Sequence, residues 1–144
     1  MGKNLLSLAR KLEHKSKVIN KKASEAAIMV AEKLVMTLAS STPVDTSQAL
    51  SNWIVEINAR PEDSIGPHFP GKFGSTQGMS LLETIAEAKR VLALKDPGET
   101  IYISNLLSYI RDLNDGTYPQ HPVGWIEGAI FQARRELKTI KLRM

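Results

Sequence analysis

The segment at residues 71–78, GKFGSTQG, has the glycines and the lysine that a phosphate-binding loop could use. Such loops hold phosphate on backbone N–H groups, and they need a Gly-Lys-Ser/Thr at a fixed distance after a first glycine. That spacing is absent here, and no hydrophobic strand leads into the segment. We therefore expect a flexible loop at residues 71–78 and no nucleotide site.

Side chains that could hold a metal or act as acid and base are few and scattered. The histidines are His14, His68 and His121, and none is spaced with a second histidine or a glutamate as zinc ligands are. Cysteine is absent, which excludes thiolate ligands and disulfides. Two pairs of acids could serve as paired carboxylates, but acids at such positions usually lie on solvated surface: Glu62/Asp63 and Glu83/Glu87. We predict no catalysis, no metal and no cofactor.

The size and composition indicate one globular domain, residues 1–144. A chain of 144 residues with 42% hydrophobic residues can bury a core without a second domain. No apolar run is long enough to span a membrane, and the first residues lack the apolar stretch and cleavage site of a signal peptide. We expect the protein to remain in the cytoplasm where it is made.

Charge is distributed unevenly along the chain. Residues 134–144 carry a net +4, and residues 23–133 carry a net −6. Residues 1–22 hold seven basic residues against one acid, a net +6: Lys3, Arg10, Lys11, Lys15, Lys17, Lys21 and Lys22. Basic ends on an acidic body could serve nucleic acid, an anionic membrane or contacts between copies of the chain. A solvated helix face is the simpler interpretation, and without aromatic residues any DNA contact there would involve only the phosphate backbone.

The apolar pattern predicts a long helix followed by a strand. Apolar residues recur at three- and four-residue steps over residues 3–40, with a gap near Lys15, and the basic first half is expected to project from the core. Pro43 should end this helix, and Asp45 or Thr46 could cap a short turn after it. Residues 53–60 then alternate as a half-buried strand, with Trp53 on its apolar face.

The rest of the chain alternates loop, helix and strand. Residues 61–79 hold three prolines and four glycines and have no period, which predicts a long loop. Ser80 and Glu83 form a capping box for a helix whose inner face is Leu81, Ile85, Ala88 and Leu92. A strand at 100–104 follows. Asn105 could cap a helix at 106–114, with the apolar side Leu106, Tyr109, Ile110 and Leu113. A turn at Asp115 and Gly116 and a last helix from Gly124 complete the pattern, with Trp125, like Trp53, a core or interface anchor.

This order predicts an α+β fold: a long N-terminal helix and a small antiparallel or mixed sheet with helices packed on one face. The parts are a basic helix at 1–40, an α+β core at 41–133 that contains the loop at 61–79, and a basic C-terminal end at 134–144. A third strand, from the loop or from a neighbouring chain, would make the sheet more robust.

Two blocks of the sequence resemble a family of tailed-phage proteins. The first block, residues 42–53, resembles the T-P-V-D-T-G-x-L-x-x-S-W signature of neck and tail-completion proteins, the minor tail components that join head to tail in siphophages. It is carried by Pro43, Val44, Asp45, Thr46, Leu50 and Trp53. The second block resembles that family's N-x-x-x-Y-A-x-x-L-E-x-G and Q-x-P-x-G-F/W segments. It is carried by Asn105, Tyr109, Leu113, Gly116, Pro122, Gly124 and Trp125, with Gln120, His121 and Ala129. The order of the elements agrees as well.

The chain departs from the family pattern at two positions. Ser47 replaces the glycine after the Val-Asp-Thr, so we expect no positive φ there. The acidic residue before the turn glycine is shifted by one position, at Asn114 and Asp115.

The resemblance implies a virion protein without enzymatic activity, in a ring at the head–tail junction through which DNA passes as non-specific cargo. Six- or twelve-fold symmetry is implied by the symmetries of tails and portals. Residues 61–79 are then an assembly loop, with Phe69, Lys72 and Phe73 at the interface together with the basic residues of the N-terminal helix. That helix is expected to face a neighbouring neck protein, an adaptor, a stopper or a tail terminator. Tail terminator and head-side adaptor stay open as roles for the chain itself. A small nucleic-acid-binding regulator is the alternative from another class.

Overall fold

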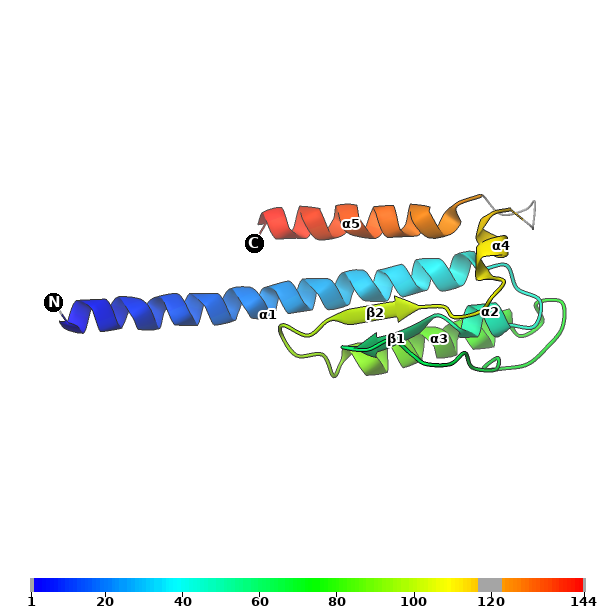
Figure 1. The fold of residues 1–144 in the computed structure, drawn as a ribbon, viewed down its shortest axis with the longest axis horizontal. Coiled ribbons are helices and arrows are strands. Elements are labelled where there is room, and N and C mark those ends of the chain that lie inside the picture. Colours follow the sequence, from blue (N-terminus) through cyan, green and yellow to red (C-terminus); the bar gives the residue numbers. More distant parts are fainter. Residues whose placement is uncertain (1, 117–122, 144) are drawn as a thin grey trace.

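The longest element is one continuous helix, α1 (Gly2–Ser41), which runs the length of the molecule (Figure 1). The computed structural model describes residues 2–116 and 123–143, without the side chain of Lys3. The predicted helix is confirmed, and it has no break near Lys15. It ends two residues before Pro43, whose ring has no N–H to continue the hydrogen-bond ladder.

The sheet consists of two antiparallel strands, β1 (Ile54–Ile57) and β2 (Ile101–Ser104). Val55 pairs with Ile103 and Ile57 with Ile101, so these four side chains share one face. Val55 is buried, and the other three pack against buried residues of α1 and of α3 (Gln77–Leu92). The α+β class and the antiparallel sheet are thus confirmed. No third strand occurs among residues 2–116 and 123–143.

β1 is shorter than the predicted strand at both ends. Trp53 is buried but precedes β1, and the residues from Asn58 onward are not in the strand. Asn58 has φ 64°, which ends the extended conformation. Its N–H donates to the Thr100 carbonyl at 2.8 Å and its side-chain oxygen accepts from the Thr100 N–H at 2.9 Å, so Asn58 joins the end of β1 to the residue before β2.

The predicted capping box is wrong. α3 begins at Gln77, so the loop is three residues shorter than the predicted 61–79, and Ser80 lies inside the helix with its side chain buried. The Ser80 hydroxyl accepts a hydrogen bond from the Phe69 N–H at 3.2 Å, and Glu83 pairs with Arg90 instead of reaching back. The buried positions of α3 recur every four residues, at Ser80, Thr84, Ala88 and Leu92, while the expected Leu81 and Ile85 are half-buried.

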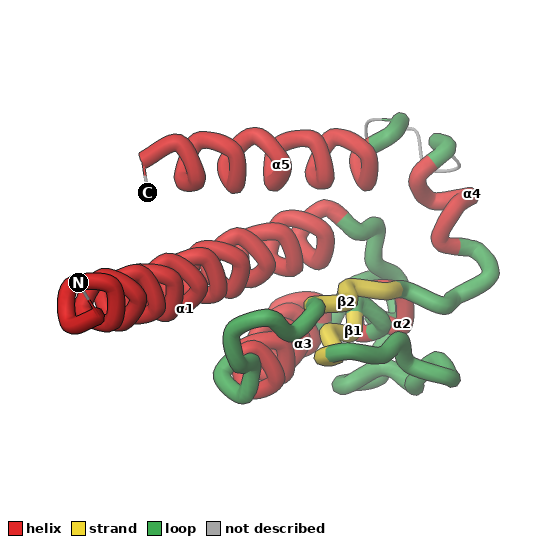
Figure 2. The backbone as a smooth tube through the Cα atoms, turned by 60° about the vertical axis from the view of Figure 1, so that its left-hand side comes forward, coloured by secondary structure: helices red, strands yellow, loops and turns green. Residues whose placement is uncertain are grey.

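Three helices complete the core at the C-terminal end of α1: α2 (Gln48–Ser51), α4 (Ile110–Asn114) and α5 (Trp125–Arg143). α5 runs antiparallel beside α1 (Figures 1 and 2). The predicted helix at 106–114 is shorter than expected because its first residues form a turn. Leu107 takes the buried position there, and Leu106, expected on the apolar side, is exposed. Tyr109 is also on the exposed side, at 37%.

Candidate assembly site

The turn after α1 is held by a buried chain of hydrogen bonds. The indole Nε1–H of Trp53 donates to Thr42 Oγ1 at 2.8 Å, and the Thr42 hydroxyl donates to the Leu38 carbonyl at 2.7 Å. Thr42 is 1% exposed and Trp53 7%, so water cannot replace these partners. This chain fixes the first signature block to the last turn of α1.

Asp45 fastens the long loop to the same turn. Its Oδ1 accepts from the Phe73 N–H at 2.6 Å, and its backbone carbonyl accepts from the Gly74 N–H at 2.8 Å. The prediction that Asp45 or Thr46 caps the following helix is therefore wrong. Ser47 occupies the cap position of α2 without a side-chain capping bond.

Ser47 has φ 69°, which corrects the expectation that a serine here needs no left-handed backbone. Its side chain is 1% exposed, and its Oγ lies 2.9 Å from Thr76 Oγ1, at the start of α3. A buried hydroxyl bond thus holds the serine in the conformation that a glycine would adopt freely.

Asn52 and Ser51 bind the first half of the loop. Asn52 exchanges two hydrogen bonds of 2.8 Å with the backbone of Ile65, one from its amide to the carbonyl and one from the Ile65 N–H to its Oδ1. The Ser51 hydroxyl accepts from the His68 N–H at 2.9 Å. The residues after Pro61 are thus tied to α2 and are not a free arm. The sequence predicted a flexible loop without a period, and it did not predict these hydrogen bonds.

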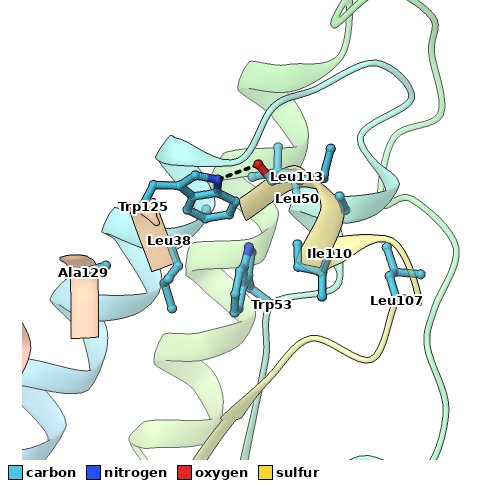
Figure 3. Packing of buried hydrophobic residues seen from close by; sticks show 10 residues of the cluster. Leu38, Leu50, Trp53, Leu107, Ile110, Leu113, Trp125 and Ala129 are labelled. Atoms are coloured by element: carbon cyan, nitrogen blue, oxygen red, sulfur yellow. Dashed lines mark hydrogen bonds between the residues drawn. The ribbon is translucent and has the colours of Figure 1, made fainter. Parts of the chain in front are cut away.

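The two signature blocks meet in space. The rings of Trp53 and Trp125 lie edge to face with centroids 6.2 Å apart, and Trp125 Nε1–H donates to the Leu113 carbonyl at 3.2 Å (Figure 3). The Asn105 amide donates to the Ala49 carbonyl at 3.0 Å and ties β2 to α2. Its Oδ1 accepts from the Leu107 N–H at 3.3 Å, the bond expected of a cap, but α4 begins only at Ile110, so Asn105 closes the turn before that helix. A cleft of about 180 Å³ lies at this junction, lined from the first block and by Tyr109 and Leu113.

The connection from α4 to α5 depends on Asn114. Its Oδ1 accepts from the Ile126 N–H at 2.9 Å, and its amide donates to both Glu127 carboxylate oxygens, at 3.0 and 2.8 Å. Hydrogen bonds from Asn114 and then from the Glu127 backbone N–H hold the pKa of the Glu127 carboxyl below its usual range. The turn also needs Gly116, whose φ is 99° and where a Cβ would meet Val123 Cγ2 at 2.9 Å.

The signature residues divide between core and surface. Two are half-buried glycines with positive φ, Gly116 and Gly124, and Pro122 lies outside the described residues, as do Gln120 and His121. The buried members are Pro43, Leu50, Trp53, Leu113 and Trp125. Val44 and Asn105 are half-buried, and Asp45, Thr46 and Tyr109 are exposed. Most of the signature therefore builds the fold and the loop anchor.

The tip of the loop presents an aromatic side chain to solvent. Phe73 is 93% exposed and has φ 57°, a backbone region that phenylalanine seldom adopts. Asp45 holds it there through the short bond to its N–H. Lys72 is exposed beside it, and Phe69 is 40% exposed. A bulky apolar group fixed in an exposed position is typical of a contact residue.

The first half of α1 touches no other element. Arg10, Lys11, Lys15, Lys17, Lys21 and Lys22 are all exposed, and Lys17 makes an i,i+4 ion pair with Glu13 at 3.6 Å. Five apolar side chains of this half are also more than half exposed: Leu5, Leu6, Leu8, Leu12 and Ile19. The prediction that the basic first half of α1 projects from the core is confirmed. Its exposed leucines also form an apolar surface.

No group of three or more acids or histidines in the described part of the chain is placed to hold a metal ion. The helices within these residues include none long and apolar enough to cross a membrane. Comparison with protein-family models, with curated proteins and with solved structures found no match to this chain.

Proposed function

We propose that this chain is a structural subunit of a tailed-phage neck, a tail-completion protein that forms a ring at the head–tail junction. In this role it has no enzymatic activity, it resides in the virion, and DNA passes through its ring. The sequence resemblance names the class. The arrangement of its residues supports it, because both signature blocks converge on the Trp53–Trp125 contact although they are far apart in the sequence.

The observation that carries the assembly role is the apolar stripe on the projecting half of α1. Leu5, Leu8 and Leu12 are 68%, 53% and 58% exposed. Large apolar side chains in a row on a projecting helix expose a surface that association removes from water. A subunit that works only in an assembly can carry such a surface, because its partner is always present.

The charge distribution supports contacts between identical copies. The C-terminal end of α5 points in the same direction as the N-terminal half of α1 and lies beside the middle of that helix (Figure 1), so both basic segments lie on the side of the acidic body from which α1 projects. Copies arranged head to tail bring opposite charges together. A heterologous contact of this kind closes into a ring when its rotation permits.

The loop is the second assembly element in this proposal. Phe73 stands at its tip, and Asp45, a signature residue, holds the tip in place. The loop would then contact a neighbouring copy or face the channel. Because Asp45, Ser51 and Asn52 all bind its backbone, removing the loop would also disturb the core, and point substitutions at its tip are the sharper test.

The first test is the mass in solution by light scattering, over a wide range of protein concentration and at low and high salt, with electron microscopy of the assembled fraction. Closed oligomers of defined mass, visible as rings, would support the proposal. High salt should weaken them, since charge contacts between exposed groups are screened. A monomer at every concentration and salt would refute self-assembly.

A nucleic-acid-binding regulator is the second candidate, favoured by the six exposed basic side chains of the projecting half of α1. Such a protein binds duplex DNA, and its affinity falls steeply with salt because counterions are released from the phosphates. A neck subunit should bind duplex DNA weakly at moderate salt. Titration of labelled duplex at two salt concentrations separates the candidates.

A further inference from the structure

The exposed leucine stripe of α1 continues a face that is buried farther along the same helix. Leu5, Leu8, Leu12 and Ile19 recur at helical steps, and the same row runs on through Ala26 and Val30. Ala26 and Val30 are 5% and 6% exposed, whereas the four residues before them are 53% exposed or more. The face that packs inside the molecule therefore extends beyond its own core.

None of the described elements covers this stripe. α1 is a continuous helix, and residues 4–22 extend past the end of α5 and away from the sheet (Figures 1 and 2). At 1.5 Å per residue this segment is about 28 Å long. A rigid helix of that length cannot fold back onto the described body, so its apolar side chains are open to a partner.

A regular charge pattern accompanies the stripe. A lysine follows three residues after Leu8, Leu12 and Ile19, at Lys11, Lys15 and Lys22 respectively. Residues three apart are neighbours on a helix surface, so the lysines form a row along one side of the stripe. The surface that fits this segment is an apolar groove with acids along one edge.

The body of the molecule has such a groove between β1, α3 and residues 65–68. It has a volume of about 330 Å³, and we call it the β1–α3 groove. Its lining is mostly apolar, with Ile54, Ile65 and Val91 among its residues, and it also includes Glu56 and Glu87. Ile65 is 39% exposed, which leaves part of the groove wall accessible.

The acids of the groove are not fully neutralised within the chain. Glu87 shares the single guanidinium of Arg90 with Glu83, whose Oε1 lies 2.7 Å from Arg90 Nη2. The hydrogen bonds that Arg90 donates, first to Glu87 and then to Glu83, raise the pKa of Arg90. Two carboxylates on one guanidinium leave one negative charge, and Glu56 makes no ion pair with any described residue.

We propose that the β1–α3 groove of one copy binds the projecting segment of α1, residues 4–22, from a second copy. Leu8 and Leu12 enter the groove, and Lys11 and Lys15 lie against Glu56 and Glu87. This charge match favours a second copy over a different neck protein as the partner of the basic helix. The inference rests on the proposed assembly of identical subunits and names the two surfaces that meet.

Engineered cysteines test the contact directly, because the wild-type chain has none. The variant Leu12→Cys/Ile65→Cys places one thiol on the stripe and one on the groove, both at exposed positions. Oxidation should give a ladder of cross-linked dimers, trimers and higher species on a denaturing gel. The matched control Leu12→Cys/Phe131→Cys moves the second thiol to the 63% exposed Phe131 on α5 and should give no ladder.

Charge exchange tests the same contact without a covalent bond. Glu56→Lys/Glu87→Lys and Lys11→Glu/Lys15→Glu should each weaken association about tenfold or more, because like charges then face each other. Combining both pairs in one chain should restore association. Lys138→Glu/Lys141→Glu reverses as many basic charges on α5 and should weaken association less than Lys11→Glu/Lys15→Glu, because the inference places only the α1 lysines against the groove.

The outcomes separate this inference from the proposed function. Rings that form without the Leu12–Ile65 ladder, or without sensitivity to either charge pair, overturn the groove contact and leave the neck role standing. A wild-type chain that stays monomeric overturns both. Binding of duplex DNA that Lys11→Glu/Lys15→Glu abolishes, with assembly unaffected, assigns the helix to nucleic acid and also overturns the inference.

Discussion

Replacing Thr42 by valine should destabilise the fold, because the indole N–H of Trp53 loses its hydrogen-bond acceptor. Valine keeps the shape of threonine but removes Oγ1, which accepts from Trp53 Nε1 at 2.8 Å and donates to the Leu38 carbonyl at 2.7 Å. Trp53 is 7% exposed and Thr42 1%, so water does not reach the indole N–H. Leaving a buried donor unpaired costs about 1–3 kcal/mol, and the lost bond to Leu38 adds to this.

We therefore expect Thr42→Val to lower the free energy of unfolding by about 2–3 kcal/mol. In urea titrations followed by tryptophan fluorescence, this is a fall in the midpoint of about 1 M for typical denaturant slopes. Thr37→Val is the matched control, because the Thr37 hydroxyl also donates four residues back, to the Lys33 carbonyl at 3.0 Å, but at the solvent side of α1. It should change stability by less than about 0.5 kcal/mol.

A double-mutant cycle distinguishes the hydrogen bond from a general effect of the substitution. In a Trp53→Phe background the indole donor is absent, so Thr42→Val should cost about 1 kcal/mol less than in the wild type. Equal costs in both backgrounds, or a loss for Thr42→Val no larger than for Thr37→Val, would refute the reasoning from a buried chain of bonds.

Three further substitutions test separate parts of the site. Phe73→Ala should change the free energy of unfolding of the monomer by less than about 0.5 kcal/mol, because the side chain is 93% exposed. If the loop tip is a contact, the same substitution should weaken association, measured by light scattering, about tenfold or more. Ser47→Ala should be less stable than Ser47→Gly by about 1 kcal/mol in urea, since both lose the bond to Thr76 and only alanine keeps a Cβ at positive φ; equal stabilities would contradict this. Glu127→Gln should be less stable than the wild type at neutral pH. The bonds that lower the Glu127 pKa stabilise the fold above the ordinary glutamate pKa, and this is lost as pH falls through the folded pKa, so the difference in urea midpoint should shrink below about pH 4. A difference that does not change with pH would show that the charge of Glu127 is not involved.

The elements with a strong period could be predicted from the sequence. The apolar steps of α1, the alternation around Val55 and the row from Trp125 to Ala129 are local patterns, and each produced the expected element. The exposure of the basic half of α1 also followed from its charge, because lysine ammonium groups stay in water.

The polar side chains at the centre of the site could not be predicted in the same way. Ser80 has the spacing of a capping box, but it lies in the helix because the loop before it supplies Phe69 as a hydrogen-bond partner. Asp45 could cap the next helix, yet it binds the Phe73 N–H. A local pattern names a donor or acceptor, whereas its partner across the loop depends on tertiary structure.

Ser47 shows how far a signature can be interpreted from residue types alone. The absence of glycine argued for an ordinary φ, and the structure has 69°. The strain is tolerated because Ser47 Oγ meets Thr76 Oγ1 at 2.9 Å in a partly buried hydrogen bond, and because the Ser51 N–H donates to the Ser47 carbonyl at 3.0 Å. The informative feature of the sequence is the run of small polar residues before Trp53. Such a run indicates buried hydrogen bonds rather than a turn exposed to solvent.

The position of these polar residues explains how a small core can present a rigid contact. Asp45, Ser51 and Asn52 tie the loop to α2, and Thr42 and Trp53 tie the same turn to α1. A contact surface that is already ordered in the monomer loses less conformational entropy on association than a free loop would. The loop tip and the β1–α3 groove are both built from the segment that this network fixes. The projecting half of α1 is the opposite case, since its described side chains are exposed and, under the proposal, it packs only against a second copy.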